Sequence, residues 1–167
     1  SDTSLLFELE NKIVVKKEPF PFSTAENFLP KDLILTAEKE FNNFSSSIDD
    51  GNARYQKFKS GFANYEEMPN SIKKIIELFY SKGFIKILEK KFELEEIEPD
   101  WKLHGGGMHQ SNKNGYLKVH SDFIYRRKSK QRRVLNLLLY LNSDWQKEWN
   151  GSLELWDKNM TEIKKKN

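Results

Sequence analysis

Hydrophobic residues recur at helical spacing in the first half of the chain and at strand-like spacing in the second half. Pro30 precedes one apolar helical stripe, and Ser71 is a suitable N-cap for a second. Gly83 is expected to end or break the second helix, after which the apolar pattern resumes. The apolar positions are Leu33, Ala37 and Phe41 in the first stripe, Ile72, Ile75, Ile76 and Phe79 in the second, and Phe84, Ile87 and Leu88 in the third. We interpret these stripes as core faces of helices.

From Trp101 onward, short segments punctuated by Gly and Asn replace the helical pattern. They are WKLHGGGMHQ, GYLKVHSDF, RVLNLLLYLN and GSLELWD. Four strand candidates in a row predict an antiparallel sheet or sandwich with the helices packed against one side. Upstream, Ile13–Val15 predicts a short strand, and the polar stretch 43–66 predicts a long loop or irregular strands.

No repeat or break in composition divides the chain, so we expect one domain over residues 1–167. Helical support would span about 30–92, and the β core would begin at about 101. The sequence has no cysteine, so any metal must be held by nitrogen and oxygen ligands. No apolar run is long enough to span a membrane, and the first residues do not resemble a signal peptide. The expectation is a cytoplasmic protein without membrane contact.

Four of the five arginines lie between Arg126 and Arg133. We consider two interpretations of this cluster. It is either a solvated, mobile loop beside the active site or a set of residues with a specific role. A net charge of +3 and the lack of aromatic residues beyond Tyr125 for base stacking argue against nucleic acid as a partner.

The triplet His120-Ser121-Asp122 is the sharpest candidate for chemistry. Alternate residues of a strand point to the same face, so the imidazole and the carboxylate would project together. Such a pair can supply two corners of the facial triad of two histidines and one carboxylate that holds iron(II). An H-x-D triplet also occurs by chance as a surface His beside an Asp, so the surrounding sequence must decide.

That context has a recognisable order. Gly105, Gly106 and Gly107 precede His109, and Gly115-Tyr116-Leu117 leads into the His-x-Asp triplet. The segments RVLNLLLYLN, Trp145 and GSLELWD follow. In this order and spacing the block resembles the central part of the prolyl-4-hydroxylase-like iron(II)- and 2-oxoglutarate-dependent oxygenases, and the early stretch PFPF…ENFLP is similar to their opening.

The resemblance implies a double-stranded β-helix (jelly roll), mainly β with supporting helices. It implies a dioxygenase that couples 2-oxoglutarate decarboxylation to hydroxylation of an aliphatic C–H. The cofactors would be Fe(II) and the cosubstrate 2-oxoglutarate, with ascorbate as a further candidate. The substrate, a protein (for example a prolyl residue) or a small molecule, is not readable from the sequence.

The resemblance also assigns roles to individual residues. His120 and Asp122 would ligate iron, and Tyr140 would hydrogen-bond the 2-oxoglutarate. Leu153 falls where the family places an aliphatic residue against the cosubstrate, and His109 lies near a cosubstrate-contacting position. For the last three, ordinary core packing or a structural role remains an equal alternative. The three glycines are expected to allow a bulge or a close backbone approach.

The chain departs from the family pattern in two ways. Asn150 replaces the first glycine of a usual pair, which a turn tolerates. No histidine follows His120 and no arginine follows Arg133, so the third iron ligand and the basic residue for the cosubstrate are missing. We expect the natural polypeptide to continue with strands that carry both, since only about half of the jelly-roll strands are present. His104 or His109 is a weaker candidate for the third ligand, and an inactive jelly-roll binding module is the alternative function.

Overall fold

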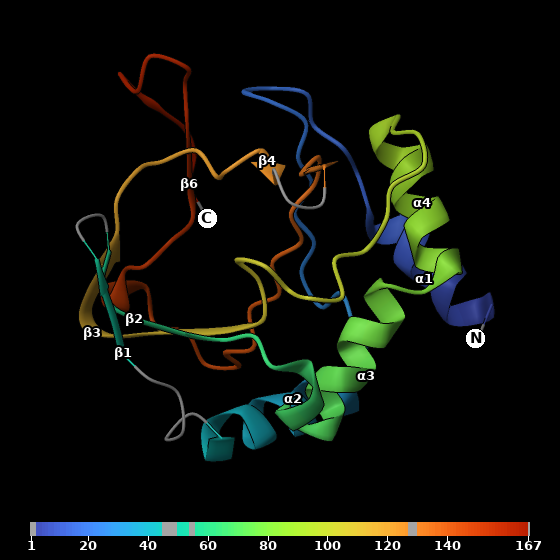
Figure 1. Ribbon diagram of the computed structural model, residues 1–167, viewed down its shortest axis with the longest axis horizontal. Helices are drawn as coiled ribbons and strands as arrows, with labels where there is room; N and C mark the ends of the chain where they lie inside the picture. Colours follow the sequence, from blue (N-terminus) through green and yellow to red (C-terminus); the bar gives the residue numbers. More distant parts are fainter. Residues whose placement is uncertain (1–2, 45–49, 54–55, 127–129, 167) are drawn as a thin grey trace.

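Helices and sheet occupy opposite sides of the molecule in the computed structural model, which describes residues 3–44, 50–53, 56–126 and 130–166 (Figure 1). The α-helices are α1 (Thr3–Lys12), α2 (Lys31–Phe44), α3 (Asn70–Phe79) and α4 (Lys82–Phe92). Short 3-10 turns cover Tyr65–Glu67 and Lys147–Trp149. Helix α1 packs against α4, and α2 packs against α3.

The strands form three separate antiparallel sheets. The largest has the order β1-β2-β3, with β2 in the centre. A two-stranded hairpin pairs β4 with β5, and a second pairs β6 with β7. The strands are β1 (Asp50–Ala53), β2 (Gln56–Phe62), β3 (Met108–Leu117), β4 (Tyr125–Arg126), β5 (Gln131–Arg132), β6 (Glu154–Trp156) and β7 (Ile163–Lys166).

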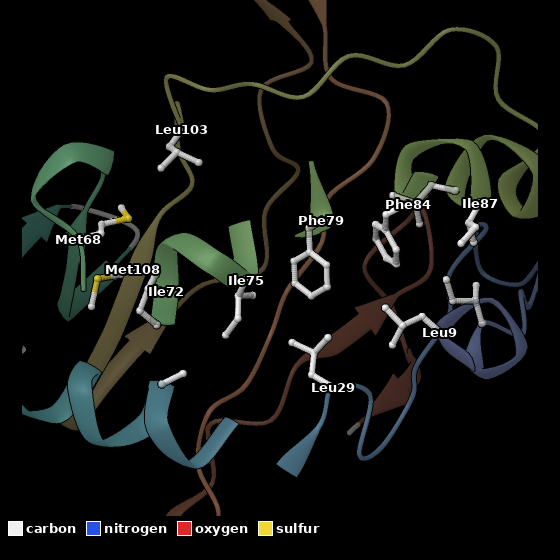
Figure 2. Close-up of a cluster of buried hydrophobic side chains, with 13 residues drawn as sticks. Leu9, Leu29, Met68, Ile72, Ile75, Phe79, Phe84, Ile87, Leu103 and Met108 are labelled. Carbon is white, nitrogen blue, oxygen red and sulfur yellow. The ribbon is translucent and has the colours of Figure 1, made fainter. Parts of the chain in front are cut away.

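The buried core is built mainly by the helices (Figure 2). Phe84 is fully buried, and its ring lies 5.2 Å from that of Phe79 and 6.1 Å from that of Phe28. Among the described residues that follow α4, only Leu103 and Met108 are buried members of this core. Burial of apolar surface is the main favourable term in folding, so the helical half carries most of it.

The three predicted helical stripes are confirmed as α2, α3 and α4. Two details were wrong. Ser71 is not the N-cap but lies inside the first turn of α3, which begins at Asn70. Gly83 does not end a helix but lies in the first turn of α4, where an added Cβ would meet the Leu6 side chain at 2.5 Å. Gly83 therefore allows α1 and α4 to approach closely.

The N-terminal part also differs from expectation. Helix α1 was not predicted, and Ile13–Val15 is not a strand, although Lys16 and Phe22 form an isolated bridge. Ile13 is buried and belongs to the helical core, so its apolar character serves helix packing. The stretch 43–66 contains the end of α2 and then β1 and β2, which agrees with irregular strands.

The expected jelly roll is not clearly formed by the described residues. Residues 134–142, predicted as a strand, run extended, and no backbone ladder joins them to another described segment. A strand needs a neighbour for its N–H and C=O groups, and within 130–166 only β5, β6 and β7 are paired. The fold is therefore a helical layer with three small sheets.

Alternate residues of this segment nevertheless differ in how they pack. Leu135, Leu139 and Leu141 are half-buried against the helical core, while Leu138 and Tyr140 are exposed. Leu137 departs from the pattern, with 42% of its surface exposed. The period of two sets which side chains face the core even without a ladder.

Among the described residues, no helix combines the length and the apolar character needed to cross a membrane.

Ser71 links α3 to α2 through hydrogen bonds. Its backbone N–H and its hydroxyl both donate to Glu40 Oε2 of α2, at 2.9 Å and 2.6 Å. The hydroxyl, followed by the N–H, lowers the pKa of Glu40 below its usual 4.5. An anionic group near the first turn of a helix also satisfies an otherwise unpaired N–H and interacts favourably with the helix dipole.

We predict that Glu40→Gln lowers the free energy of unfolding by roughly 1 kcal/mol at neutral pH, because a charged acceptor becomes neutral. Since the folded-state pKa is depressed, this contribution is present above pH 4.5 and is lost as the pH falls through the folded-state value. Urea unfolding at several pH values measures it. The exposed Glu26→Gln is the control, and equal effects of the two substitutions would contradict the prediction.

Candidate metal centre

The side chains of His120 and Asp122 meet in the extended segment that follows β3. Asp122 Oδ1 lies 3.2 Å from His120 Nε2. The segment was predicted as part of a strand, but β3 ends at Leu117, so that boundary was wrong. His120 and Asp122, two residues apart, nevertheless have their side chains in contact. The predicted pairing of an imidazole with a carboxylate is therefore present.

The hydrogen bonding of His120 favours a metal-ligating tautomer. Its Nδ1 lies 2.7 Å from the Lys118 carbonyl oxygen, which can only accept, so Nδ1 carries the hydrogen. In the neutral ring, Nε2 then presents its lone pair towards the carboxylate oxygen. A metal-bound histidine commonly donates its other ring N–H to a backbone carbonyl in this way.

The separation also fits a shared ion. Two donor atoms each about 2.1 Å from an ion and at right angles to each other lie about 3.0 Å apart. His120 and Asp122 therefore fit two neighbouring corners of an octahedral Fe(II) site. Within the described residues, however, no group of three or more His, Cys, Asp or Glu residues could hold a metal.

The second carboxylate oxygen of Asp122, Oδ2, contacts two residues that follow β5. Oδ2 lies 3.2 Å from Arg133 Nη1 and accepts a short hydrogen bond from Asn136 Nδ2. Oδ1 is left on the side of His120. The carboxylate therefore has a defined orientation although 41% of the side chain is exposed.

Arg133 is itself fixed on three sides. Its Nη2 donates to the His104 carbonyl oxygen at 2.7 Å, and its guanidinium lies 4.1 Å from the centroid of the Phe123 ring. Only 21% of its side chain is exposed. A planar guanidinium suits this combination of two hydrogen bonds and ring stacking.

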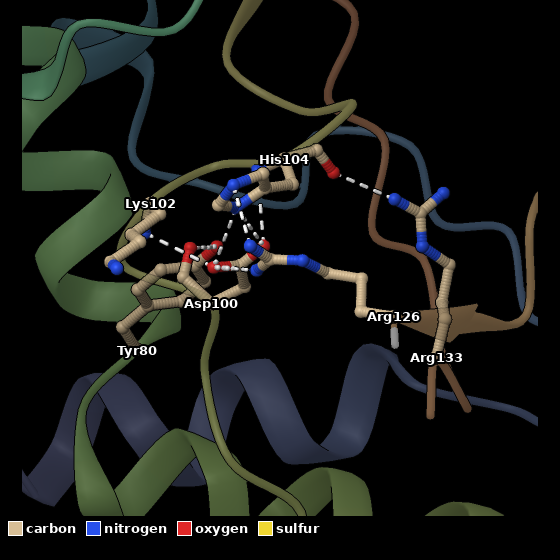
Figure 3. Close-up of polar contacts among 6 residues, drawn as sticks. All are labelled: Tyr80, Asp100, Lys102, His104, Arg126 and Arg133. Atoms are coloured by element: carbon tan, nitrogen blue, oxygen red, sulfur yellow. Dashed lines mark hydrogen bonds and ion pairs between the residues drawn. The ribbon is translucent and has the colours of Figure 1, made fainter. Parts of the chain in front are cut away.

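A turn anchored by Asp100 positions the His104 carbonyl (Figure 3). The Asp100 carboxylate accepts from the backbone N–H groups of Lys102 at 3.1 Å and His104 at 3.0 Å. The Tyr80 hydroxyl, at the end of α3, donates to the Asp100 carbonyl oxygen at 3.2 Å. The turn therefore links the helical layer to Arg133.

Two pKa values reflect this arrangement. Burial acts to raise the pKa of Asp100, but the His104 N–H, the His104 ring and the Lys102 N–H together hold it below its usual 3.8. Burial, followed by the nearby Asp100 carboxylate, raises the pKa of the Tyr80 phenol. Asp100 is therefore ionised at neutral pH, and Tyr80 is a hydrogen-bond donor.

Both ring nitrogens of His104 are engaged within this network. Nδ1 lies 3.3 Å from Asp100 Oδ2, and Nε2 lies 2.7 Å from Arg126 Nη2. The carboxylate needs a hydrogen on Nδ1, so Nε2 accepts from Arg126. His104, the weaker candidate for a third metal ligand, therefore has both ring nitrogens engaged with protein partners.

The interpretation of the basic run as a solvated loop is wrong for two of its arginines. Strands β4 and β5 pair antiparallel, and residues 127–129 lie outside the described residues. Arg126 and Arg133 are mostly buried in polar contacts, whereas Arg132 is exposed. The absence of a nucleic-acid partner stays a prediction.

The expected close approach at the glycines is confirmed. Gly105 has φ +68°, and a Cβ there would lie 3.1 Å from both Arg133 Nη2 and Phe123 Cε1. At Gly107, with φ +92°, a Cβ would collide with the Phe62 carbonyl oxygen of β2. Gly105 lets the backbone approach Arg133, and Gly107 lets β3 begin beside β2.

The remaining predicted site residues lie on other segments. Tyr140 is 62% exposed, and its hydroxyl makes no hydrogen bond within the described residues. Desolvation by nearby segments nevertheless raises the pKa of its phenol. Leu153 is half-buried just before β6, and His109 is on β3 in register with Gly61. Their contact with a cosubstrate stays a prediction.

A hollow of about 440 Å³ lies elsewhere, between Tyr65 and Trp101. Its lining includes none of the predicted site residues. We therefore base the functional site on the donor atoms of His120 and Asp122.

Comparison with known proteins supports the same part of the chain. Residues 106–167 match the family model described as 2OG-Fe(II) oxygenase superfamily. The match includes His120, Asp122, Tyr140 and Leu153 and supports an oxygenase relationship for this segment. No curated protein and no solved structure matches the chain.

The sequence did not reveal the supporting residues. Asp100 was not singled out, although the spacing of Asp100 and His104 could have indicated a turn closed by a carboxylate. Arg133 was noted only as a member of the basic cluster. Strand parity would place Asn136 on the same face as Tyr140, and its side chain donates to Asp122.

We predict that Asp100→Ala lowers the free energy of unfolding by roughly 1–3 kcal/mol, because two backbone N–H groups, the His104 ring and Arg126 lose an acceptor. The folded-state pKa is lowered, so this stabilisation is present above pH 3.8 and disappears as the pH falls through the folded-state value. Thermal and urea unfolding would measure the loss. Glu98→Gln, at an exposed neighbouring position, is the control, and an unfolding curve for Asp100→Ala that matches this control would contradict the prediction.

Proposed function

We propose that the protein is an iron(II)- and 2-oxoglutarate-dependent oxygenase that hydroxylates an aliphatic C–H group. The observation that carries this proposal is the His120–Asp122 donor pair, 3.2 Å apart, inside the segment that matches the oxygenase family model. The prolyl-4-hydroxylase-like subfamily is the finer proposal, and it is supported by the order of motifs from Gly105 to Asp157.

In this proposal His120 binds Fe(II) through Nε2 and Asp122 binds it through Oδ1. When bound, the metal and 2-oxoglutarate together supply the oxygen activation that amino-acid side chains cannot supply. The Lys118 carbonyl keeps the ring hydrogen of His120 on Nδ1. Asn136 and Arg133 orient the Asp122 carboxylate by contacting its Oδ2. The chain thus orients both donors before a metal binds.

Tyr140, Leu153 and His109 are proposed to contact the cosubstrate. Exposure of Tyr140 leaves its hydroxyl accessible to an incoming carboxylate. Within the described residues no third donor joins the pair. A protein or a small molecule remains the substrate class, and the proposed location is the cytoplasm.

We predict that His120→Ala and Asp122→Ala each lower the formation of succinate from 2-oxoglutarate by more than about 100-fold in the natural full-length protein. Loss of a metal ligand should exceed the 10- to 100-fold effects seen for supporting residues. Succinate is measured with Fe(II), with and without candidate substrates.

The exposed Asp144→Ala is the matched control and should retain wild-type turnover. Wild-type turnover in either ligand variant would refute the site assignment. A wild-type protein that neither binds a divalent ion nor forms succinate would instead favour the inactive jelly-roll binding module.

A further inference from the structure

We infer that Arg133 is a positioning residue that fixes the Asp122 carboxylate for metal binding, and that the Asp100–His104 turn in turn fixes Arg133. This inference rests on the proposed function, because it concerns the same donor pair. It adds a chain of contacts that runs from the end of α3 to the metal-binding carboxylate: Tyr80, Asp100, His104, Arg133 and Asp122.

The first step concerns which oxygen faces the metal. A carboxylate on an exposed, extended segment can rotate and present either oxygen, or both. Arg133 Nη1 and Asn136 Nδ2 both engage Oδ2, so only Oδ1 remains on the side of His120 Nε2. The two residues therefore select binding through one oxygen.

The second step concerns what keeps Arg133 in place. A fully exposed arginine side chain would adopt many rotamers and could not hold the Asp122 carboxylate in one orientation. Here the other end of the guanidinium donates to the His104 carbonyl, and its face covers the Phe123 ring. The His104 carbonyl is held by the Asp100 carboxylate through the His104 N–H. Arg133 is therefore oriented from both ends.

Gly105 supplies an independent observation. It follows the carbonyl that accepts from Arg133, and an added Cβ would come within 3.1 Å of both Arg133 Nη2 and Phe123. The positive φ of this residue also disfavours a side chain. At the neighbouring Gly106, where φ is not positive, a Cβ would meet only the Leu103 backbone, at 3.6 Å and beyond.

Positioning and simple electrostatics predict opposite signs for the loss of Arg133. A positive guanidinium near a divalent cation repels it, so neutralising Arg133 should strengthen metal binding if charge alone mattered. If Arg133 acts by orienting Asp122, the same substitution should weaken metal binding. Arg133→Lys keeps the charge but loses the planar fork and the stacking, so it should also weaken binding.

The test is the affinity for Mn(II), used as a spectroscopic substitute for Fe(II) and measured by electron paramagnetic resonance on the natural full-length protein, far below each variant's melting temperature. Arg133→Gln and Arg133→Lys should each weaken binding by roughly 10- to 100-fold, the range for groups that orient a ligand. The exposed Arg132→Gln should change it by less than about twofold, since it removes the same charge from the surface.

If the Arg133 variants do not fold, the glycine pair provides the same test with the arginine intact. Gly105→Ala should weaken Mn(II) binding and change the Mn(II) spectrum, whereas Gly106→Ala should not. Unchanged or tighter binding in Arg133→Gln, or equal behaviour of the two glycine variants, would overturn the inference.

Different results would contradict the positioning role of Arg133 and the proposed oxygenase function. Loss of binding in His120→Ala and Asp122→Ala, with no effect of Arg133→Gln, would remove the positioning role alone. Absence of Mn(II) binding in the wild-type protein would overturn the proposed function and this inference with it.

Discussion

The guanidinium of Arg133 joins the turn at His104 to the segment that carries Asp122. One nitrogen donates to the backbone of the turn at His104, and another contacts the carboxylate of Asp122. Because this group is planar and its face is covered by Phe123, the two contacts have a fixed geometry. The direction in which Asp122 faces His120 depends on that geometry.

The stability of the molecule and the arrangement of its site have different sources. The helices bury Phe79, Phe84 and their neighbours, whereas the segments after Leu117 expose much of their apolar surface, with Ile124 57% and Leu138 60% exposed. The site is consequently held by polar contacts rather than by enclosure in a core. Polar networks of this kind depend on every member being satisfied, which is why the Asp100 turn and Gly105 matter to a carboxylate many residues away.

Sequence patterns predicted the helical half well because apolar stripes at helical spacing directly encode burial, as for Ile72, Ile75 and Phe79. Helix α1 was missed because its short pattern is weak and its packing partner, α4, lies far along the chain. Strand assignments fared worse. The alternation in residues 134–142 correctly indicated that Leu135 and Leu139 face the core, but pairing depends on a partner strand that periodicity does not specify.

The residues of the candidate site likewise fall into two groups, those that a local sequence pattern predicted and those that it did not. The local spacing of His120 and Asp122 brought the two donors together whether or not the backbone was a strand, because extended residues alternate. Arg133 reaches the site through contacts between distant segments, so no local pattern could identify it. At Asn150 the backbone has φ +56° and ψ −144°, a region that strongly favours glycine, which agrees with the glycine that the family pattern has at this position.

The most direct measurement of the central claim is the anomalous scattering of Mn(II) in crystals of the natural full-length protein. The account predicts a single peak about 2.0–2.2 Å from both His120 Nε2 and Asp122 Oδ1, with Asp122 Oδ2 still bonded to Arg133 and Asn136. A peak that avoids these two atoms, or a map without one in which His120 Nε2 bonds directly to Asp122, would contradict it.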